Sequence, residues 1–453
     1  MIKGRIALWL GLAAALFIVD SAGAAPPQPP ACEKVPCAGS TCLSSITAAQ
    51  ATVPEQACPA RGGESQNGVD IFSWNEFIAL NWPATQACEP DTTKSILDIK
   101  TGKEGPVVWQ TQMTSDDVFV APGQTPAPWC NGKSLAALFA KQPIDLAHTA
   151  QTAALPQSLH NLRSVISQPT DVEAVRGVVT DQAGRWLRYE RLMNKTEYDQ
   201  IVGQKWYQLS VLDTLPSITL PSASIEFKSA WKILSPDEIA GGRFYTTQAT
   251  VYNTPDGAKS PGANPVTLGL VGLHIINKTE RPGGFFWSTF EQVDNDTTFF
   301  KPHRTGPYNK QTARKPYTEL DPNGKPINAP VQIKRLHKIA ANPGLNAYYQ
   351  QLLAGSVFAN YRLVSTQWQS GLVLQGEPPN VANIVIETYV QNATSKPQAA
   401  SAFPAGFFPQ PKPGHRTLST VASTGCLACH INATAANKRK TVTDHSFLFL
   451  EAQ

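Results

Sequence analysis

The chain contains 453 residues, of which 42% are hydrophobic and 16% are charged, and its formal net charge is +4. The apolar share excludes wholesale disorder. So small and scattered a charge does not provide the basic face of a nucleic-acid-binding protein. Beyond residue 25, no stretch supplies the roughly 20 apolar residues of a membrane-spanning helix. We therefore expect a globular protein whose mature form neither spans a membrane nor binds nucleic acid.

The first 24 residues have the three parts of a secretory signal peptide. Lys3 and Arg5 provide positive charge, residues 6–19 are almost entirely apolar, and residues 22–24 are the small side chains of a cleavage site. An uncleaved membrane anchor is the alternative, although the apolar run is short for a span. We expect cleavage after residue 24 and export to the periplasm.

The cysteines fall into two groups, and the early group has six members: Cys32, Cys37, Cys42, Cys58, Cys88 and Cys130. An even set in an exported protein is typical of disulfide bonds, and six cysteines allow 15 pairings. A metal site or a redox pair is the alternative, but this group has no CxxC spacing and no His at a ligand interval. We expect three disulfides, with Cys88 bonded to Cys130 because both lie in loop-like, Pro-rich sequence.

The chain from residue 69 predicts a mixture of helices and strands. Residues 69–81 carry apolar side chains at three- and four-residue spacing, which predicts a helix that ends before Pro83. Residues 184–206 have helical spacing as well. Short apolar or alternating runs, separated by Pro-, Asp- and Gly-containing loops, then predict antiparallel strands at 224–234, 243–252, 266–276 and 285–290.

Residues 300–330 form a long polar segment in which six basic residues outnumber two acidic ones. Charge runs usually face solvent, so a surface loop is the simpler interpretation. Loops of this length are also often functional, which leaves open a docking patch for an acidic redox partner protein.

The remaining elements complete an α+β body with an antiparallel sheet core, peripheral helices and long loops. Helical spacing resumes over 332–355, a strand is expected at 361–368, and 384–390 fits a strand or a short helix. The chain divides into a signal peptide (1–24), a Pro- and Cys-rich segment (25–68), the body (69–391), a Pro- and Ala-rich tether (392–415) and a C-terminal segment (416–453).

The second cysteine group is a CxxCH motif formed by Cys426, Cys429 and His430, which is the attachment signature of a c-type haem. The two thiols add to the two vinyl groups of the porphyrin, and the His that follows binds the iron as proximal ligand. A disulfide in a tight loop and half of a zinc site are the alternatives, but a zinc site needs a second Cys/His pair. Because an export signal accompanies the motif, we expect one covalently bound haem c.

The sequence after the motif is too short for a small class I cytochrome c fold. Only 23 residues follow His430, and no Met occurs after Met193 to become the second axial ligand. We expect a helix over 424–437 that docks on the body, which then supplies most of the haem pocket. The apolar run 446–450 should be buried beside the haem or as a strand at the sheet edge.

The sixth iron ligand has several candidates, and an empty or water-bound position is also open. His274 lies in an expected strand, where a lone His is more often a hydrogen-bonded core residue. His445 can fold back on the motif, and His415 precedes it. Trp287 is either a pocket residue or a core residue. Positive charge for the haem propionates is available from Arg416, Lys438 and Arg439.

Five segments of the body occur together with the CxxCH motif. They are 73–83 (SWNEFIALNWP), 272–279 (GLHIINKT), 287–295 (WSTFEQVDN), 366–368 (TQW) and 387–389 (ETY). In this combination the chain resembles a group of exported bacterial single-haem proteins, usually described only as cytochrome c family proteins. The resemblance extends over nearly the whole mature chain. It implies haem binding and redox activity, and it implies no substrate.

The sequence thus predicts an exported monohaem c-type cytochrome that transfers electrons. The alternative is a haem enzyme of peroxidase or oxygenase type, or a haem-based ligand binder, with a substrate site in the large body. An iron with both axial positions filled by the protein favours electron transfer, whereas an open position favours chemistry or ligand binding.

Overall fold

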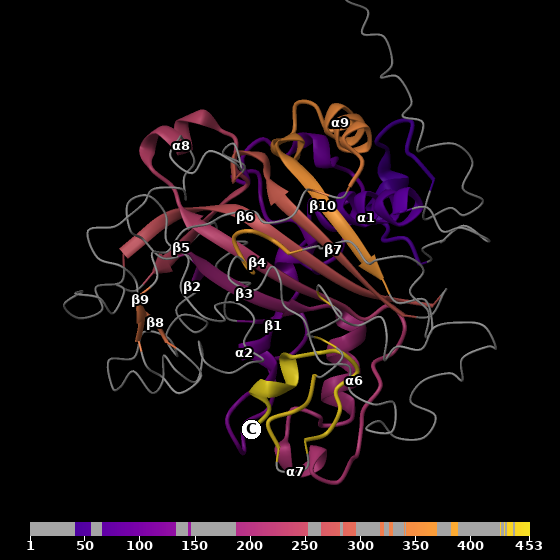
Figure 1. Cartoon of the computed structure of the whole chain (residues 1–453), viewed down its shortest axis with the longest axis vertical. Coiled ribbons are helices and arrows are strands. Elements are labelled where there is room, and N and C mark those ends of the chain that lie inside the picture. The colour runs from indigo at the N-terminus through magenta and orange to yellow at the C-terminus, as the bar shows by residue number, and fades with distance from the viewer. Residues whose placement is uncertain are drawn as a thin grey trace, which may run out of the picture.

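The computed structural model gives an α+β fold built on one large sheet. It describes residues 41–55, 66–132, 144–145, 187–251, 264–280, 284–295, 318–320, 326–328, 339, 341–368, 382–387, 426, 430, 433–437 and 440–453. Within these residues eight strands form the sheet, and helices pack around it (Figure 1). The expected fold class is confirmed, and this fold is not the small helical one of a class I cytochrome c.

The strands of the sheet are β1 (Met113–Thr114), β2 (Ile144–Asp145), β3 (Arg188–Met193), β4 (Ile225–Ile233), β5 (Thr246–Val251), β6 (Asn264–Thr279), β7 (Gly284–Gln292) and β10 (Tyr361–Trp368). The order β1–β3–β4–β6 makes one half. On its other edge, the first part of the long strand β6 pairs with β5, and β2 pairs with the outer edge of β5. The second part of β6 pairs on the same edge with β7, and β10 pairs with the outer edge of β7. All neighbours are antiparallel except β2 and β5.

The register divides the side chains between two faces, because directly paired residues in an antiparallel sheet project to the same side. Phe227 pairs with Ile275, and both project to one face. Lys228 pairs with His274, which pairs with Thr289, and these three project to the other. We call the first the helical face, because helices cover it, and the second the C-terminal face, because part of the C-terminal segment packs against it.

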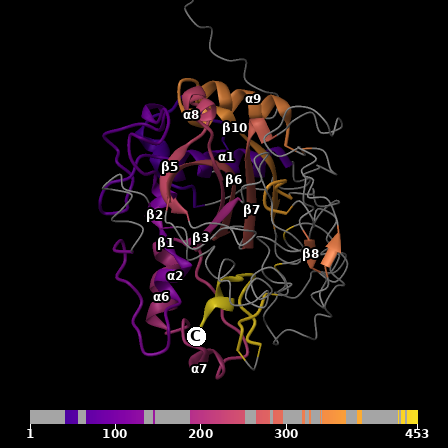
Figure 2. The ribbon, with the colours of Figure 1, turned by 90° about the vertical axis from the view of Figure 1, so that its left-hand side faces the viewer.

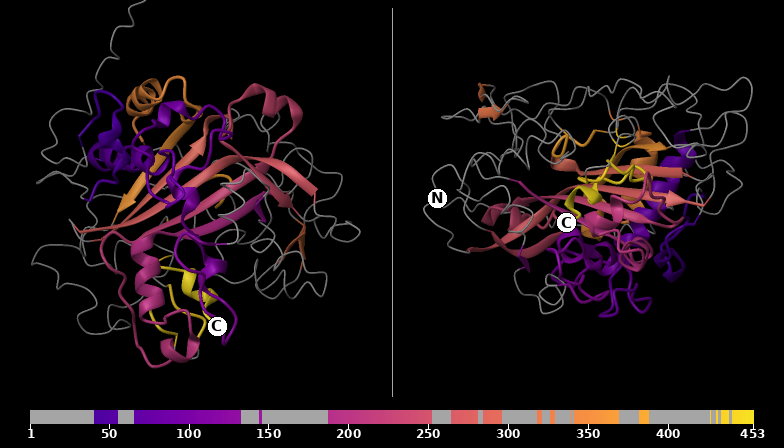
Figure 3. Two further views of the ribbon diagram at one scale, coloured as in Figure 1. Left: turned by 180° about the vertical axis from the view of Figure 1, so that it is seen from behind. Right: turned by 90° about the horizontal axis from the view of Figure 1, so that it is seen from below.

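The helical face is covered by α1 (Gln66–Leu80) and α9 (Pro343–Leu352), which lie in front of the sheet when it is seen from behind (Figure 3). Their contact with the sheet is aromatic. Trp74 stacks on Tyr349 with ring centroids 5.1 Å apart, and Phe77 stacks on Phe290 at 4.2 Å. The helix expected over 69–81 is confirmed as α1.

The expected helix over 184–206 is wrong in its first part. Residues Arg188–Met193 form β3, and only Lys195–Gly203 are helical, as α6. The strand was hidden because Arg188 and Glu190 are charged and yet buried, so β3 lacks an alternation of apolar and polar side chains. The other short helices around the sheet are α2 (Ser115–Val118), α7 (Leu209–Leu212) and α8 (Pro236–Gly241).

The other expected elements are largely confirmed. The four strands between residues 224 and 290 are β4, β5, β6 and β7, the strand at 361–368 is β10, and α9 lies within 332–355. Of the strand or short helix expected at 384–390, residues 384–387 form a turn, and 388–390 lie outside the described residues. Within 300–330, β8 (Thr318–Leu320) pairs with β9 (Pro326–Asn328). The tether over 392–415 lies outside the described residues.

The predicted disulfide between Cys88 and Cys130 is confirmed, with a Cα–Cα distance of 5.9 Å. Cys42 is also disulfide-bonded. The remaining early cysteines, Cys32, Cys37 and Cys58, lie outside the described residues. Among the helices that the structure describes, none is long and apolar enough to cross a membrane.

Candidate functional site

The C-terminal segment docks on the body beside α6 and α7, at the lower end of the sheet (Figures 1 and 2). The backbone N–H of Val442 donates to the carbonyl of Pro216 at 3.1 Å, and the N–H of Ile218 donates to the carbonyl of Val442 at 2.9 Å. The Nζ of Lys278, on β6, lies 2.6 Å from the Asp444 carboxylate. Backbone and charge together therefore hold this segment against the sheet.

Between His430 and His445 the chain turns back on itself. The N–H of Thr443 donates to the carbonyl of Ala433 at 3.1 Å, which brings the two limbs of the return together. Residues 433–437 are not helical, so the helix expected over 424–437 ends before them. The return places the carbonyl oxygen of His445 2.6 Å from Nδ1 of His430.

The contact between His430 and His445 determines which ring nitrogen of His430 carries the hydrogen. A carbonyl oxygen only accepts, so Nδ1 of His430 donates and Nε2 keeps its lone pair. Burial lowers the pKa of His430 to about 3, which keeps the imidazole neutral. A neutral imidazole with a bonded Nδ1–H and an open Nε2 is the form that binds a metal ion.

Cys426 and His430 are both helical and four positions apart, so their side chains share one face of a helical turn. Both are half-buried, which leaves part of each surface open to a large planar group. Cys426 packs against an apolar cluster that includes Ile276 and Trp287 of the sheet. Cys429 lies outside the described residues.

Aromatic rings surround His430 on the C-terminal face. Its ring centroid is 5.8 Å from that of Trp287 and 4.8 Å from that of Phe447. Phe285 lies 5.3 Å from the ring of His445. A haem needs such a water-poor wall, because burial sets its reduction potential.

The apolar run 446–450 is buried at the site in part, as expected, but it is not an edge strand. Residues Leu448–Glu451 form a 3₁₀-helix. Phe447 contacts His430, while Phe449 turns away and packs on Phe119 with ring centroids 5.6 Å apart. Within this run, Phe447 therefore packs against His430, and Phe449 packs into the core of the body.

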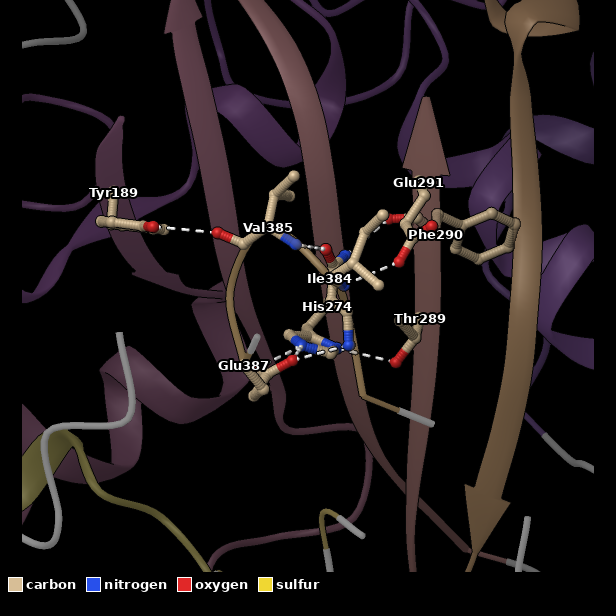
Figure 4. A network of polar contacts seen from close by, with 9 residues as sticks. Tyr189, His274, Thr289, Phe290, Glu291, Ile384, Val385 and Glu387 are labelled. Carbon is tan, nitrogen blue, oxygen red and sulfur yellow. Dashed lines mark hydrogen bonds and ion pairs between the residues drawn. The ribbon is translucent and has the colours of Figure 1, made fainter. Parts of the chain in front are cut away.

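His274 lies on the C-terminal face within a chain of polar contacts (Figure 4). Its Nε2 is 2.8 Å from an oxygen of Glu387, and its Nδ1 is 2.8 Å from the hydroxyl of Thr289. Burial favours the neutral acid, but the charge and hydrogen bond of His274 hold the pKa of Glu387 below its ordinary value. Because both ring nitrogens are engaged, this geometry fits a hydrogen-bonded core residue and not an iron ligand.

The structure thus brings His445 and Trp287 to His430, whereas His274 has partners of its own. His415 lies outside the described residues, as do Arg416, Lys438 and Arg439. Sequence reasoning included Phe447 only as part of the apolar run 446–450, and it missed the roles of Thr289 and Glu387. These two depend on strand register and on a turn, which have no sequence signal of their own.

Two buried carboxyl groups lie behind the C-terminal segment. Glu197 on α6 contacts Glu226 on β4, which also contacts Ser446. Burial raises the pKa of both, that of Glu226 to about 7, and their mutual repulsion adds to the effect on Glu197. Two buried carboxyl groups can be in contact only when at least one of them is protonated.

Comparison with known proteins does not assign the site. No protein-family model matches the chain, and no curated protein or solved structure matches it. Within the described ranges, no group of three or more His, Cys, Asp and Glu side chains has the geometry of a metal site, so the zinc alternative finds no second ligand pair there.

Proposed function

We propose that the protein is an exported c-type cytochrome that binds one haem covalently and transfers electrons to or from a redox partner protein. The observation that carries this proposal is the 2.6 Å contact between Nδ1 of His430 and the carbonyl of His445. It leaves Nε2 open in the residue that follows the two motif cysteines. A bound haem supplies one-electron chemistry at its iron.

Each residue of the motif has a separate task in this proposal. Cys426 and Cys429 would form thioether bonds to the porphyrin, and His430 would bind the iron through Nε2. Trp287 and Phe447 exclude water beside the proximal ligand. The carbonyl of residue 445 orients the His430 ring and raises its basicity, which is the usual task of such a partner.

The proposed location is the periplasm of a bacterium. Residues 1–24 have the pattern of a signal peptide. The disulfide between Cys88 and Cys130 is compatible with an oxidising compartment. Attachment of a c-type haem also takes place outside the cytoplasm.

A haem enzyme is the second candidate, and one observation favours it. Glu387, His274 and Thr289 form a continuous hydrogen-bonded chain on the same face as His430. Such a chain can pass a proton, because the carboxylate accepts, the imidazole both donates and accepts, and the hydroxyl reorients.

The test begins with covalent attachment. The full chain is produced in a bacterium that carries cytochrome c maturation enzymes, and the denatured protein is stained for haem on a gel. We expect stain in the wild type and none in the double variant Cys426→Ala, Cys429→Ala. The matched control is Cys88→Ala, Cys130→Ala, which removes two cysteines outside the motif and should keep the stain. An unstained wild type would reject the proposal.

The two candidate functions are separated by the state of the iron. Absorption and resonance Raman spectra of the stained protein report whether a second protein ligand is bound. Low-spin iron with two protein ligands supports electron transfer. High-spin iron with an open or water-bound position, together with loss of turnover in His274→Gln, supports the enzyme.

A further inference from the structure

Two buried side chains beside His430 carry nitrogen atoms without a hydrogen-bond partner. They are Nδ1 and Nε2 of His445 and Nε1 of Trp287, for which no partner occurs among the described residues. The side chain of His445 is 5% exposed, and Trp287 is 1% exposed. Buried polar groups are nearly always paired, so these atoms indicate a partner that the described residues do not supply.

The unpaired nitrogens are on two neighbouring rings, those of Trp287 and His445. The ring centroids of Trp287 and His445 are 5.9 Å apart, and Trp287 also lies 5.8 Å from His430. Both rings that carry an unpaired nitrogen are therefore neighbours of each other, and Trp287 also neighbours His430. Two N–H groups on neighbouring rings suit a carboxylate, which accepts two hydrogen bonds at once.

The chain holds His445 in position at a conformational cost. Asp444 has φ of 49° and His445 has φ of 72°, and both values lie in the left-handed region that side chains with a Cβ disfavour. Lys278 binds the Asp444 carboxylate at 2.6 Å and fixes this turn. Asp444 Oδ1 lies 3.8 Å from Nδ1 of His445, too far for a hydrogen bond, so Nδ1 is the ring nitrogen nearer a carboxylate of the chain and Nε2 has no acceptor among the described residues.

His445 does not lie where a sixth iron ligand must lie. Its own carbonyl accepts from Nδ1 of His430, on the side of that ring away from the iron-binding Nε2. If His430 held a haem iron through Nε2, residue 445 would lie on the same side of the haem as His430, and a sixth ligand would have to come from the opposite side. This removes the interpretation of His445 as distal ligand of the same haem.

We propose that His445 and Trp287 bind a haem propionate, with Nε2 of His445 and Nε1 of Trp287 as the two donors. This inference rests on the proposed function and adds a task for two residues outside the CxxCH motif. The same geometry would accept a free carboxylate or another small anion, and the test separates these sources.

The test uses the haem-loaded full chain and the variants Trp287→Phe and His445→Phe, which remove the donors and keep an aromatic ring. The matched control is Phe447→Leu, which changes a ring in contact with His430 but no polar atom. Resonance Raman spectroscopy reports the propionate-bending band, and a potentiometric titration reports the midpoint potential. The haem stain of the denatured protein reports covalent attachment separately.

We expect both donor variants to retain covalent haem, to shift the propionate band and to lower the midpoint potential, because a less compensated propionate favours ferric iron. Phe447→Leu should leave the band in place. An unmoved band in both donor variants overturns the inference and points to a free anion. A change of the iron from low to high spin in His445→Phe also overturns it, because His445 would then be a ligand. A wild type without covalent haem overturns the proposed function as well.

Discussion

Each face of the sheet buries one carboxyl group whose surroundings differ from those of the other. On the helical face, Glu76 of α1 hydrogen-bonds with the neutral side chains of Asn277 and Ser288, and burial raises its pKa to about 8. On the C-terminal face, Glu387 is equally buried, but its partner His274 keeps its pKa below the ordinary value. One carboxyl group is therefore protonated at neutral pH, and the other is ionised.

The two carboxyl groups differ in their partners. Glu76 lies among neutral side chains and beside aromatic packing, which needs no ion. Buried ion pairs contribute little net stability, because desolvation offsets their attraction. The pairing of Glu387 with His274 is therefore better explained by the function proposed for the C-terminal face than by a contribution to folding.

The largest effect is expected from the aromatic packing of the helical face. Phe77→Ala removes a ring that stacks on Phe290 at 4.2 Å and lies 5.8 Å from Phe358. We expect it to lower the free energy of unfolding by about 3–5 kcal/mol. Urea unfolding should give the same loss in haem-loaded protein and in the double variant Cys426→Ala, Cys429→Ala. A loss confined to haem-loaded protein would contradict the division between the faces.

Matched substitutions of the two carboxyl groups compare the faces directly. Glu387→Gln removes the charge that faces His274, and breaking such a buried pair costs about 3–5 kcal/mol. Glu76→Gln replaces a protonated acid by a neutral group of the same shape, so the loss at pH 6 should be below about 1 kcal/mol. Chemical denaturation of both variants measures this contrast. Equal losses would show that the two sites are electrostatically alike.

The pH dependence of stability follows from the raised pKa values. Burial raises the pKa of Asp70 to about 7 and that of Glu76 to about 8. The folded protein therefore holds protons that the unfolded chain releases near its ordinary pKa values, 3.8 for Asp70 and 4.5 for Glu76. Their contribution is complete below these values and is lost as the pH rises toward the raised pKa of each group, by up to about 1.4 kcal/mol per pH unit for each group.

Urea midpoints between pH 5 and pH 8 measure this slope. Glu76→Gln should reduce it, because one titrating group is removed. Glu190 and Glu226, with raised pKa values of about 7, act in the same direction and should leave a residual slope. An unchanged slope in Glu76→Gln would mean that Glu76 is ionised in the folded protein.

The sequence predicted elements where one periodicity dominates. Helix α1 and strands β4, β6, β7 and β10 each carry an apolar pattern over most of their length, so they were found. Strand β3 was assigned to a helix because Arg188 and Glu190 project into the interior, where a strand pattern requires apolar residues. Because tertiary contacts bury these two charged side chains, β3 lacks the alternation of apolar and polar residues by which a strand is recognised.

Only the motif residues of the candidate site could be predicted from the sequence, because a motif has fixed residue types at a fixed spacing. CxxCH identified Cys426, Cys429 and His430. The carbonyl of His445 has no sequence signature, because every residue has one. The chain of Thr289, His274 and Glu387 depends on strand register and on a turn, and neither can be read from periodicity.

The most direct test of the account is the intact mass of the denatured full-length product after export. The protein is produced with cytochrome c maturation enzymes, unfolded in acid and measured by mass spectrometry. The account predicts the mass of the chain without residues 1–24 plus one haem, and no added mass when Cys426 and Cys429 are replaced by Ala. A wild-type mass equal to that of the polypeptide alone would contradict it.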